Sequence, residues 1–450
     1  MQIAFRLSVL AAALSCTVAT PVFAQEANVS TEQELAAMRA QLQALTSRIN
    51  ELEADLAESR AVSPSTDSPI VGDTSTVSAQ QEAAPATQLA TSSGWSFKPR
   101  GRLMFDAGTV SVPDSAAADD GFGNELRRAR IGASGDLPGG FGYKFEIDFA
   151  GDEVAISDAV LTYADGPLEV AVGQHNNFQS LDELTSSLHT SFIERSAFTD
   201  AFGFERRIGA SISYSSGLIL AQAGLFTDNS ADTGTDNRGV DGRVVVMPKI
   251  GPVQMHLAGS VHYNDLGHED ASVRYRQRPF VHFTSIRYVD TRNLAADNEF
   301  GIGIEAAAIT GPFHTAAEGF WQKVDTPLEV ANPTFFGGYV EAGYFLTAGD
   351  ARGYKGGKFD RVKPVNPVGE GGFGSLQFNL RYDYLDLNDA GIVGGIQNAY
   401  EASLIWKPTD YTLFSVNYGR MDYRDAAIPM EDGDRDYGVD ALGLRAQVDF

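Results

Sequence analysis

The sequence predicts a 16-stranded antiparallel transmembrane β-barrel, preceded by a short α-helical coiled coil. Three observations predict the barrel. Apolar and polar residues alternate between Trp95 and Phe450, short turns alternate with longer polar loops, and the chain ends on the aromatic Phe450. Only every second strand residue of a spanning barrel faces lipid, so a hydrophobic content of 43% is compatible with this fold. A soluble β-sandwich would also show alternating apolar and polar residues. The pattern of turns and the C-terminal aromatic residue are therefore the stronger evidence for a membrane barrel.

Residues 1–24 are predicted to be a secretory signal peptide. Arg6 supplies a positive charge, an apolar run continues to Ala19, and Val22-Phe23-Ala24 forms a small-residue cleavage site. The apolar run is too short to cross a membrane as a helix. Cys16, the only cysteine, lies in this segment and fits a lipoprotein cleavage site poorly. The mature chain is therefore expected to contain no disulfide and no thiolate metal site.

Residues 25–60 are predicted to form a coiled-coil helix, because apolar residues recur at alternating spacings of three and four. The series is Leu35, Met38, Leu42, Leu45, Ile49, Leu52 and Leu56. Such an a/d pattern favours self-association, with dimer and trimer both open and a lone amphipathic helix as the alternative. Residues 61–94 are rich in Ser, Thr, Ala, Gln and Pro, lack Lys and Arg, and are predicted to be a flexible linker.

Residues 95–450 are predicted to form the barrel, and the turns set its strand count. Tight turns are expected at 137–140, 165–167, 215–217, 249–252, 310–312 and 408–410. Polar loops are expected near 109–124, 151–154, 175–203, 227–237, 264–297, 324–335, 387–397 and 424–436. If the C-terminus is periplasmic, strand direction makes the long segment 348–373 a periplasmic connection. The sum is 16 strands with eight external loops, a size that leaves an aqueous lumen.

Charge and motifs exclude several functions. A net charge of −25 argues against nucleic acid binding, which needs a basic surface. The sequence lacks HExxH, GxSxG and P-loop spacings, so no enzyme activity and no cofactor are expected. The acidic run Asp432–Asp436 resembles a calcium loop, but Gly443 stands where a bidentate Glu is required. Histidines are scattered singly, and no metal site is predicted.

The basic residues are the candidate site residues. Arg274, Arg276 and Arg278 alternate in a long loop, so in extended backbone all three point the same way. Such a row can offer successive weak anion sites. Segment 348–373 adds Arg352, Lys355, Lys358, Arg361 and Lys363. Strand parity places further bases on the lumen face: Lys98, Arg100, Arg102, Arg128, Arg130, Arg207 and Arg243. The alternative for each is a salt bridge to a lumen carboxylate such as Glu146, Asp148 or Asp383.

Several stretches resemble the phosphate-selective porins of the O and P type, across essentially all of 95–450. They are Leu126–Gly132 (LRRARIG), Ser180–Ser196 (SLDELTSSLHTSFIERS), Arg206–Gly209 (RRIG), Val273–Pro279 (VRYRQRP) and Thr347–Val362 (TAGDARGYKGGKFDRV). The resemblance implies a trimer of 16-stranded barrels with inward-folded loops that carry an arginine ladder and central lysines. Arg274, Arg276 and Arg278 match the ladder, and Lys355 and Lys358 lie in the inward-folded periplasmic turn. The ladder is short here, and the chain is strongly acidic.

The sequence thus predicts an outer-membrane porin for passive diffusion of anions, with inorganic phosphate or related oxyanions as substrates. Expected partners are outer-membrane lipid, two further copies in a homotrimer, the outer-membrane assembly machinery through Phe450, and cell-wall contact by a periplasmic coiled coil. One alternative is a general or sugar-type porin, which aromatic residues along the lumen would favour. Another is a barrel that only anchors an envelope tether. A membrane-embedded hydrolase is disfavoured because nucleophile motifs are missing.

Overall fold

The structure is a computed structural model that describes residues 89–90, 94–116, 118, 121–151, 153–232, 236–267, 271–327 and 332–450. The predictions for 1–24, for 25–60 and for nearly all of the linker lie outside the described residues. No helix in the described part of the chain is long and apolar enough to cross a membrane.

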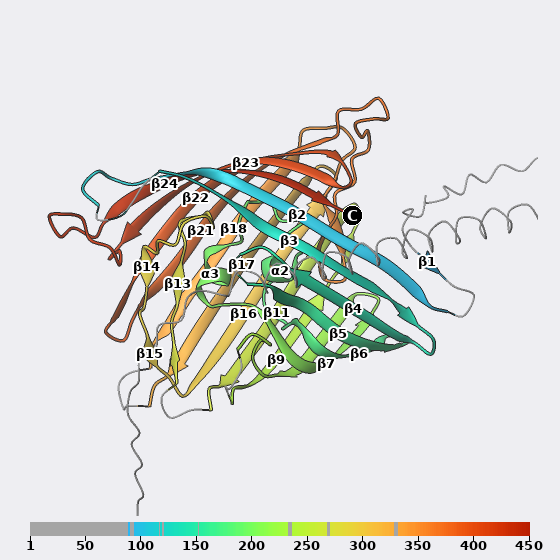
Figure 1. The fold of residues 1–450 in the computed structure, drawn as a ribbon, viewed down its shortest axis with the longest axis horizontal. Coiled ribbons are helices and arrows are strands. Elements are labelled where there is room, and N and C mark those ends of the chain that lie inside the picture. The colour runs from blue at the N-terminus through green and yellow to red at the C-terminus, as the bar shows by residue number, and fades with distance from the viewer. Residues whose placement is uncertain are drawn as a thin grey trace, which may run out of the picture. The chain divides into compact units, whose positions relative to one another are not determined.

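The described residues contain sixteen strands that close into one antiparallel barrel, as predicted (Figure 1). They are β2 (Ser96–Ser111), β3 (Gly121–Leu137), β4 (Phe141–Asp148), β5 (Ala155–Asp165), β6 (Leu168–Asn176), β7 (Arg206–Ser216), β8 (Ile219–Phe226), β9 (Arg238–Val246), β11 (Val253–Asp265), β16 (Asn298–Thr310), β17 (Phe313–Asp325), β18 (Thr334–Phe345), β21 (Ser375–Asp389), β22 (Ile392–Thr409), β23 (Thr412–Arg424) and β24 (Tyr437–Asp449). Closure comes from β2 against β24, in a register from Arg102↔Asp449 to Ser111↔Asp440.

Short elements complete the fold. Two helices, α2 (Leu181–Leu184) and α3 (Ala197–Ala201), lie between β6 and β7. The remaining short strands are β1 (Leu89–Ala90), β10 (Lys249–Ile250), β12 (Ser272–Val273), β13 (Arg276–Gln277), β14 (Val289–Asp290), β15 (Leu294–Ala295), β19 (Gly353–Lys355) and β20 (Lys358–Asp360). The pair β19–β20 is a hairpin within the predicted periplasmic connection 348–373.

The connections follow the predicted order. Tight turns link β3 to β4, β5 to β6, β7 to β8, β16 to β17 and β22 to β23, and we call this the turn end. The other end, which carries the polar loops, is the loop end. One boundary differs from the expectation. Instead of an eleven-residue loop over 387–397, β21 and β22 meet at Ala390 and Gly391. Both have positive φ, 50° and 84°, the geometry of a tight hairpin turn.

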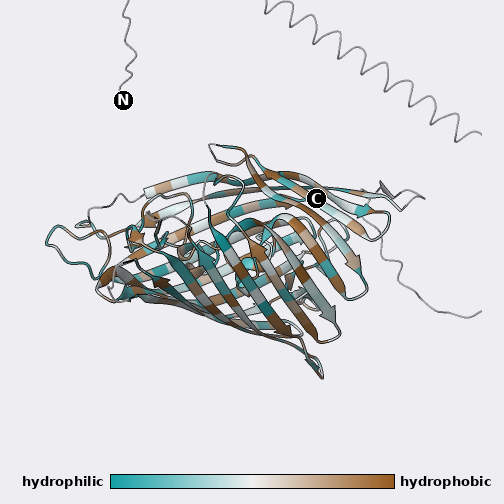
Figure 2. Cartoon of the chain, turned by 90° about the horizontal axis from the view of Figure 1, so that it is seen from below, coloured by the Kyte–Doolittle hydropathy of each residue, from teal (hydrophilic) through white to brown (hydrophobic). Residues whose placement is uncertain are grey.

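The outer surface of the barrel is apolar. Leu103, Phe105, Ile131, Ile208 and Val244, all predicted to face outward, are between 42% and 63% exposed. Figure 2 shows the matching alternation of hydrophobic and hydrophilic residues along the strands. Side chains this apolar are stable in contact with lipid, whereas in water they would form a very large exposed patch. The alternation therefore belongs to a membrane barrel.

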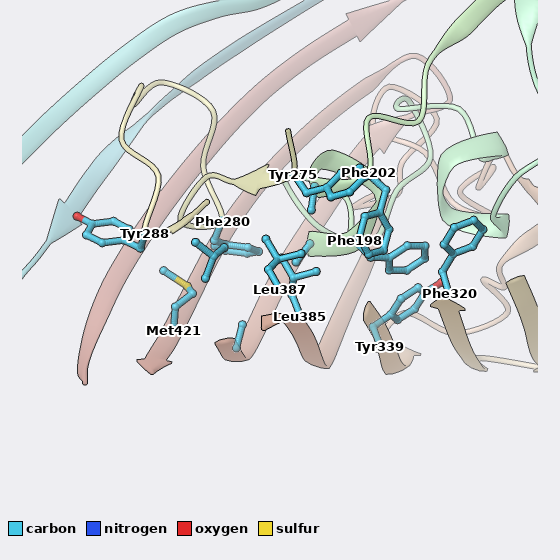
Figure 3. Close-up of a cluster of buried hydrophobic side chains, with 14 of the residues drawn as sticks. Phe198, Phe202, Tyr275, Phe280, Tyr288, Phe320, Tyr339, Leu385, Leu387 and Met421 are labelled. Atoms are coloured by element: carbon cyan, nitrogen blue, oxygen red, sulfur yellow. The ribbon is translucent and has the colours of Figure 1, made fainter. Parts of the chain in front are cut away.

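One half of the lumen is filled by folded-in loops. Phe198 and Phe202 of the β6–β7 connection pack against Phe320 of β17, at centroid distances of 6.1 and 5.8 Å. Tyr275 and Phe280, from the β11–β16 connection, belong to the same buried cluster. Figure 3 shows these side chains against the inner faces of the later strands. This apolar packing covers much of the inner face of β16–β24.

Candidate functional site

Residues 177–205, which we call the constriction segment, are held inside the barrel by wall carboxylates. The backbone N–H groups of Leu181 and Asp182, at the start of α2, donate to the two carboxylate oxygens of Glu318, each at 2.8 Å. The N–H of Ala197 donates to Asp383 at 2.7 Å. Hydrogen bonds to carboxylates are stronger than neutral ones, so these contacts fix the segment in place.

Glu318 and Asp383 belong to an acidic wall. Its members are six inward carboxylates on β16–β22, all less than a tenth exposed: Glu299, Glu305, Glu318, Glu341, Asp383 and Glu401. Each accepts at least one hydrogen bond from the wall or from a segment folded against it. The guanidinium of Arg381 lies 2.5 Å from Glu401. A buried carboxylate is stable only when it is paired in this way, so the acidic wall is covered rather than open to solutes.

Strands β2–β9 form a basic wall on the other half of the barrel. Its inward bases are Lys98, Arg100, Arg102, Arg127, Arg128, Arg130, Lys144, Arg206, Arg207 and Arg243. Many have carboxylate partners: Arg102 lies 3.1 Å from Glu146, and Arg130 lies 2.7 Å from Asp148. Arg102 and Arg130 therefore form salt bridges to lumen carboxylates, which was the alternative to their acting as anion sites.

A β-bulge brings two successive arginines into the lumen. The register between β2 and β3 shifts at Met104/Phe105, so Leu126 pairs with Phe105 and Arg128 with Met104, leaving Arg127 as the extra residue. Arg127 donates to both carboxylate oxygens of Glu194, at 2.7 and 2.9 Å. Burial alone would raise the pKa of Glu194, but Arg127 holds that pKa well below its ordinary value.

The basic wall and the constriction segment enclose a cavity of about 320 Å³, which we call the loop-end cavity. Six arginines line it: Arg127, Arg128, Arg130, Arg195, Arg206 and Arg278. Five carboxylates also line it: Asp148, Glu183, Glu194, Asp200 and Glu205. Most of these charges are engaged with one another, so the cavity holds a network of ion pairs rather than a row of free cations.

Arg128 differs from the other five arginines that line this cavity. It is only 8% exposed and, among the residues that the structure describes, forms no ion pair with a carboxylate. Its Nη1 lies 3.8 Å from Met104 Sδ, and its Nε is buried without a hydrogen-bond partner. A buried guanidinium in this state is costly unless an anion completes it. Arg128 is therefore the group in the loop-end cavity best suited to hold an anionic solute.

The predicted arginine row is extended, with its three members on one side. Arg274 and Arg276 are exposed and Arg278 is partly exposed, whereas the intervening Tyr275 and Gln277 are 3% and 4% exposed. Arg274 donates to both oxygens of Asp290, at 2.8 and 2.5 Å. Arg278 lies 3.7 Å from Asp200. Within the described chain the side chain of Arg276 forms neither a hydrogen bond nor an ion pair, although its backbone pairs with Asp290 in β14, and only Arg278 of the three lines the loop-end cavity.

Tyr275 holds this row against the barrel wall. Its hydroxyl donates to Glu299 at 2.5 Å and accepts from the side-chain amide of Gln322 at 3.2 Å. The same amide also donates to Glu299 at 3.1 Å. Because successive residues of an extended chain point to opposite sides, fixing Tyr275 to the acidic wall directs Arg274 and Arg276 away from it.

The connection 348–373 brings lysines to a second cavity, of about 370 Å³, which we call the turn-end cavity. Lys355 and Lys358, opposite each other in the β19–β20 hairpin, both line it. Arg361 instead pairs with Asp449 at the barrel seam, and Arg352 donates to the carbonyl oxygen of His189 in the constriction segment. These two arginines tie segments together, while the two lysines face the cavity.

Other candidates are placed outside both cavities or were not anticipated. Arg207 lines neither cavity, although its Nε and Nη1 are buried without hydrogen-bond partners, and Lys363 also lies outside both. Arg102 donates to Ser187 of the constriction segment at 3.1 Å. Arg127, Arg195 and Arg206 line the loop-end cavity but were not selected as site residues from sequence. Among the described side chains, no group of three or more His, Cys, Asp or Glu is arranged to hold a metal ion.

A closed barrel with an apolar outer surface, a segment fixed inside it and charged cavities along its inner wall are the features of an outer-membrane porin. The family model for phosphate-selective porin O and P matches residues 97–450. A protein of Caulobacter vibrioides described only as uncharacterised is 44% identical over 442 residues, covering 93% of this chain and 89% of its own. The chain belongs to the family of phosphate-selective porins O and P.

Solved outer-membrane structures share the fold at low identity. An anion-selective porin from Comamonas acidovorans has a TM-score of 0.51 at 13% identity, covering 79% of this chain and all of its own. The outer-membrane channel DcaP of Acinetobacter baumannii has a TM-score of 0.50 at 14% identity, covering 81% of this chain and all of its own. At such identities the likeness establishes the porin fold alone.

Proposed function

We propose that this protein is a passive channel for small anions, with phosphate or related oxyanions as its solutes. The observation that carries the proposal is Arg128, a buried guanidinium with an unpartnered Nε at the edge of the loop-end cavity. An oxyanion is the partner that such a group lacks, because its oxygens match the donor geometry of guanidinium. The anion-selective Comamonas porin offers a structural parallel.

The unequal distribution of charge in the lumen supports this proposal. The carboxylates of the acidic wall hold the constriction segment and the arginine row, whereas arginines border the loop-end cavity and the hairpin lysines Lys355 and Lys358 border the turn-end cavity. A solute that passes these cavities therefore meets Arg128, Lys355 and Lys358, which form no ion pair with a carboxylate among the described residues, even though the whole chain carries a net charge of −25. A positive field in a narrow low-dielectric path raises the local concentration of anions.

Transport in this proposal runs from the loop end, facing outside, to the turn end, facing the periplasm. An anion enters past Arg276, exchanges between Arg278 and Arg128, and leaves beside Lys355 and Lys358. No covalent step and no energy coupling are needed. Each site must release its solute quickly, so affinities of about millimolar are expected. We further propose that three copies associate, through the predicted coiled coil of residues 25–60 among other contacts.

The test is the reversal potential of the purified pore across a potassium chloride gradient in a planar bilayer. The proposal expects chloride selectivity, added phosphate that reduces the current, and weaker selectivity in Arg128→Gln. Arg424→Gln removes one charge from an exposed position at the end of β23 and serves as the matched control. A cation-selective wild-type pore, or an Arg128→Gln pore with unchanged selectivity and phosphate block, would overturn it.

A further inference from the structure

The turn-end cavity combines two kinds of polar group on two different elements. We propose that it binds a hydroxylated organic phosphate, such as a phosphorylated sugar or polyol, in preference to inorganic phosphate. This inference rests on the proposed anion channel and adds the chemical class of its larger solutes. The cationic groups lie on the β19–β20 hairpin together with the carboxylate of Asp360, and the hydroxyl and amide groups and the carboxylate of Glu169 lie on β6–β8.

The cationic side consists of Lys355 and Lys358. They are directly opposite in the hairpin register, both are exposed, and neither forms an ion pair within the part of the chain that the structure describes. Like charges opposite each other repel, so an anion placed against both is favoured. The turn between them, Gly356-Gly357, has φ of 59° and 72°, which glycine adopts without strain.

The hairpin is held at a fixed position against the barrel wall. Arg243 Nη2 donates to the carbonyl oxygen of Gly357 at 3.0 Å. The hydroxyl of Tyr354 is hydrogen-bonded to His256 Nδ1 at 2.7 Å. Because both contacts flank the turn, the two lysines stay beside the cavity instead of moving with a free loop. A preorganised pair of cations binds an anion with less loss of conformational entropy.

The facing side offers groups that recognise hydroxyls. Glu169, Ser213 and Gln222 lie on adjacent strands in register, Glu169↔Ser213 and Ser213↔Gln222, and Ser215 follows on the same face of β7. The amide of Gln222 donates to Ser213 at 3.3 Å. A carboxylate repels a bare anion but accepts well from hydroxyl groups. This side therefore suits the hydroxylated part of a solute, while the lysines suit its phosphate.

The size of the turn-end cavity and its apolar surface also favour an organic phosphate. A cavity of about 370 Å³ lies in the range for organic ligands and far exceeds the space that one phosphate ion fills. Leu220 and Phe359 add apolar surface next to the polar groups, and the C–H faces of a sugar or polyol can pack on such surface. The loop-end cavity, by contrast, is dominated by charged side chains.

The experiment compares three probes, glucose 6-phosphate, inorganic phosphate and glucose, by the concentration at which each reduces the single-pore current. Wild type is expected to bind glucose 6-phosphate several-fold more tightly than inorganic phosphate, and glucose weakly. Ser213→Ala and Ser215→Ala should each weaken glucose 6-phosphate by roughly 2- to 12-fold, the worth of one hydrogen bond, and leave phosphate unchanged. Lys355→Gln combined with Lys358→Gln should weaken both phosphates.

Matched controls are Ser211→Ala, on the same face of β7 but outside the cavity, and Lys249→Gln, an exposed lysine of β10 that lines neither cavity. Equal block by both phosphates in wild type, or unchanged glucose 6-phosphate block in both serine variants, overturns this inference while leaving a chloride-selective channel intact. Tighter block by glucose than by its phosphate overturns it in favour of a neutral sugar site. A cation-selective wild-type pore overturns the proposed channel itself. Heat-modifiable migration in gels confirms that each variant is folded.

Discussion

Arg243 on β9 reaches over β11 to form a two-point ion pair with Glu305 on β16. Arg243 Nε lies 2.8 Å from one carboxylate oxygen and Nη2 lies 2.6 Å from the other. Both side chains are 1% exposed. His256 on β11 lies between them and is hydrogen-bonded to Glu305 at 3.1 Å. One buried pair thus links three strands to the hairpin that presents Lys355 and Lys358.

Removing one partner of this pair should destabilise the barrel strongly. Arg243→Met leaves Glu305 charged and buried without its main partner, a situation that costs about 3–5 kcal/mol. Unfolding of the detergent-solubilised barrel by heat, followed by gel migration, measures the effect. Arg243→Met combined with Glu305→Gln should be less destabilising than Arg243→Met alone. A single variant as stable as wild type, or a double variant that is worse, would contradict the role given to the pair.

Glu318 should control the mobility of the constriction segment. Glu318→Ala removes both acceptors of the N–H groups of Leu181 and Asp182, each hydrogen bond being worth about 1.5–3 kcal/mol. The expected result is a flickering single-channel current in place of a steady one. Glu318→Gln keeps one acceptor oxygen and should give an intermediate trace. Steady currents of wild-type size in Glu318→Ala would show that other contacts alone hold the segment.

The three arginines of the row should contribute unequally to selectivity. Arg276→Ala removes a charge whose side chain has no partner and should lower the chloride-to-potassium permeability ratio by roughly ten-fold, because one charge about 6 Å away in water changes the local chloride and potassium concentrations by about three-fold each, in opposite directions. Arg274→Ala should lower it less, because Arg292, 3.4 Å from Asp290, remains to neutralise that carboxylate. Adding Asp290→Asn should restore part of that loss. Reversal potentials measure all three variants, and an unchanged ratio in Arg276→Ala would exclude that residue from the path.

Glu205 should make the selectivity depend on pH near neutrality. Desolvation by the surrounding protein raises the pKa of this lumen-exposed carboxyl to about 7, against the opposing charge of Arg207 and with help from Asp232 and Asp228. As the pH falls from 8 to 6, Glu205 takes up a proton and the loop-end cavity loses a negative charge. Chloride selectivity should therefore rise over this interval.

Glu205→Gln should remove this pH dependence and keep the high selectivity at pH 8. Glu431→Gln, in the loop between β23 and β24, is the control and should leave the dependence in place. Reversal potentials recorded at pH 6, 7 and 8 decide the matter. A selectivity that falls on acidification, or a dependence that persists in Glu205→Gln, would mean that another group titrates.

The barrel could be predicted from sequence because each of its rules acts locally. Alternation places Leu103 and Phe105 outward, and turn residues such as Gly217 and Gly311, both with positive φ, mark strand ends. Counting the turns then gives sixteen strands and the side on which 348–373 lies. The tight turn at Ala390-Gly391 was missed because an acidic and Gly-rich stretch resembles a loop, although Ala-Gly can adopt positive φ at both positions.

The pairing of charges could not be predicted in the same way. Arg274 was expected to be free, but Asp290, sixteen residues later, returns beside it on β14. Strict alternation of inward and outward residues also did not identify Arg127 as a lumen residue, because the bulge directs it inward. A signal was present, since Leu126 and Ile131 are both outward yet five residues apart, which strict alternation does not allow. The partners of Glu318 and Asp383 depend on how a distant segment folds back, which parity does not describe.

Because apolar packing covers the inner face of β16–β24, the two halves of the barrel have different roles. The later strands bear the scaffold, since their inward residues carry the constriction segment and the arginine row. The wall of β3–β8 borders both cavities and holds the scaffold mainly through the Arg127–Glu194 and Glu125–His282 pairs of β3. Substitutions of the other residues of this wall can change which solutes pass without releasing the constriction segment from its contacts. The solute selectivity of this pore can therefore change, in evolution or by design, through substitutions in one wall while the other wall keeps its geometry.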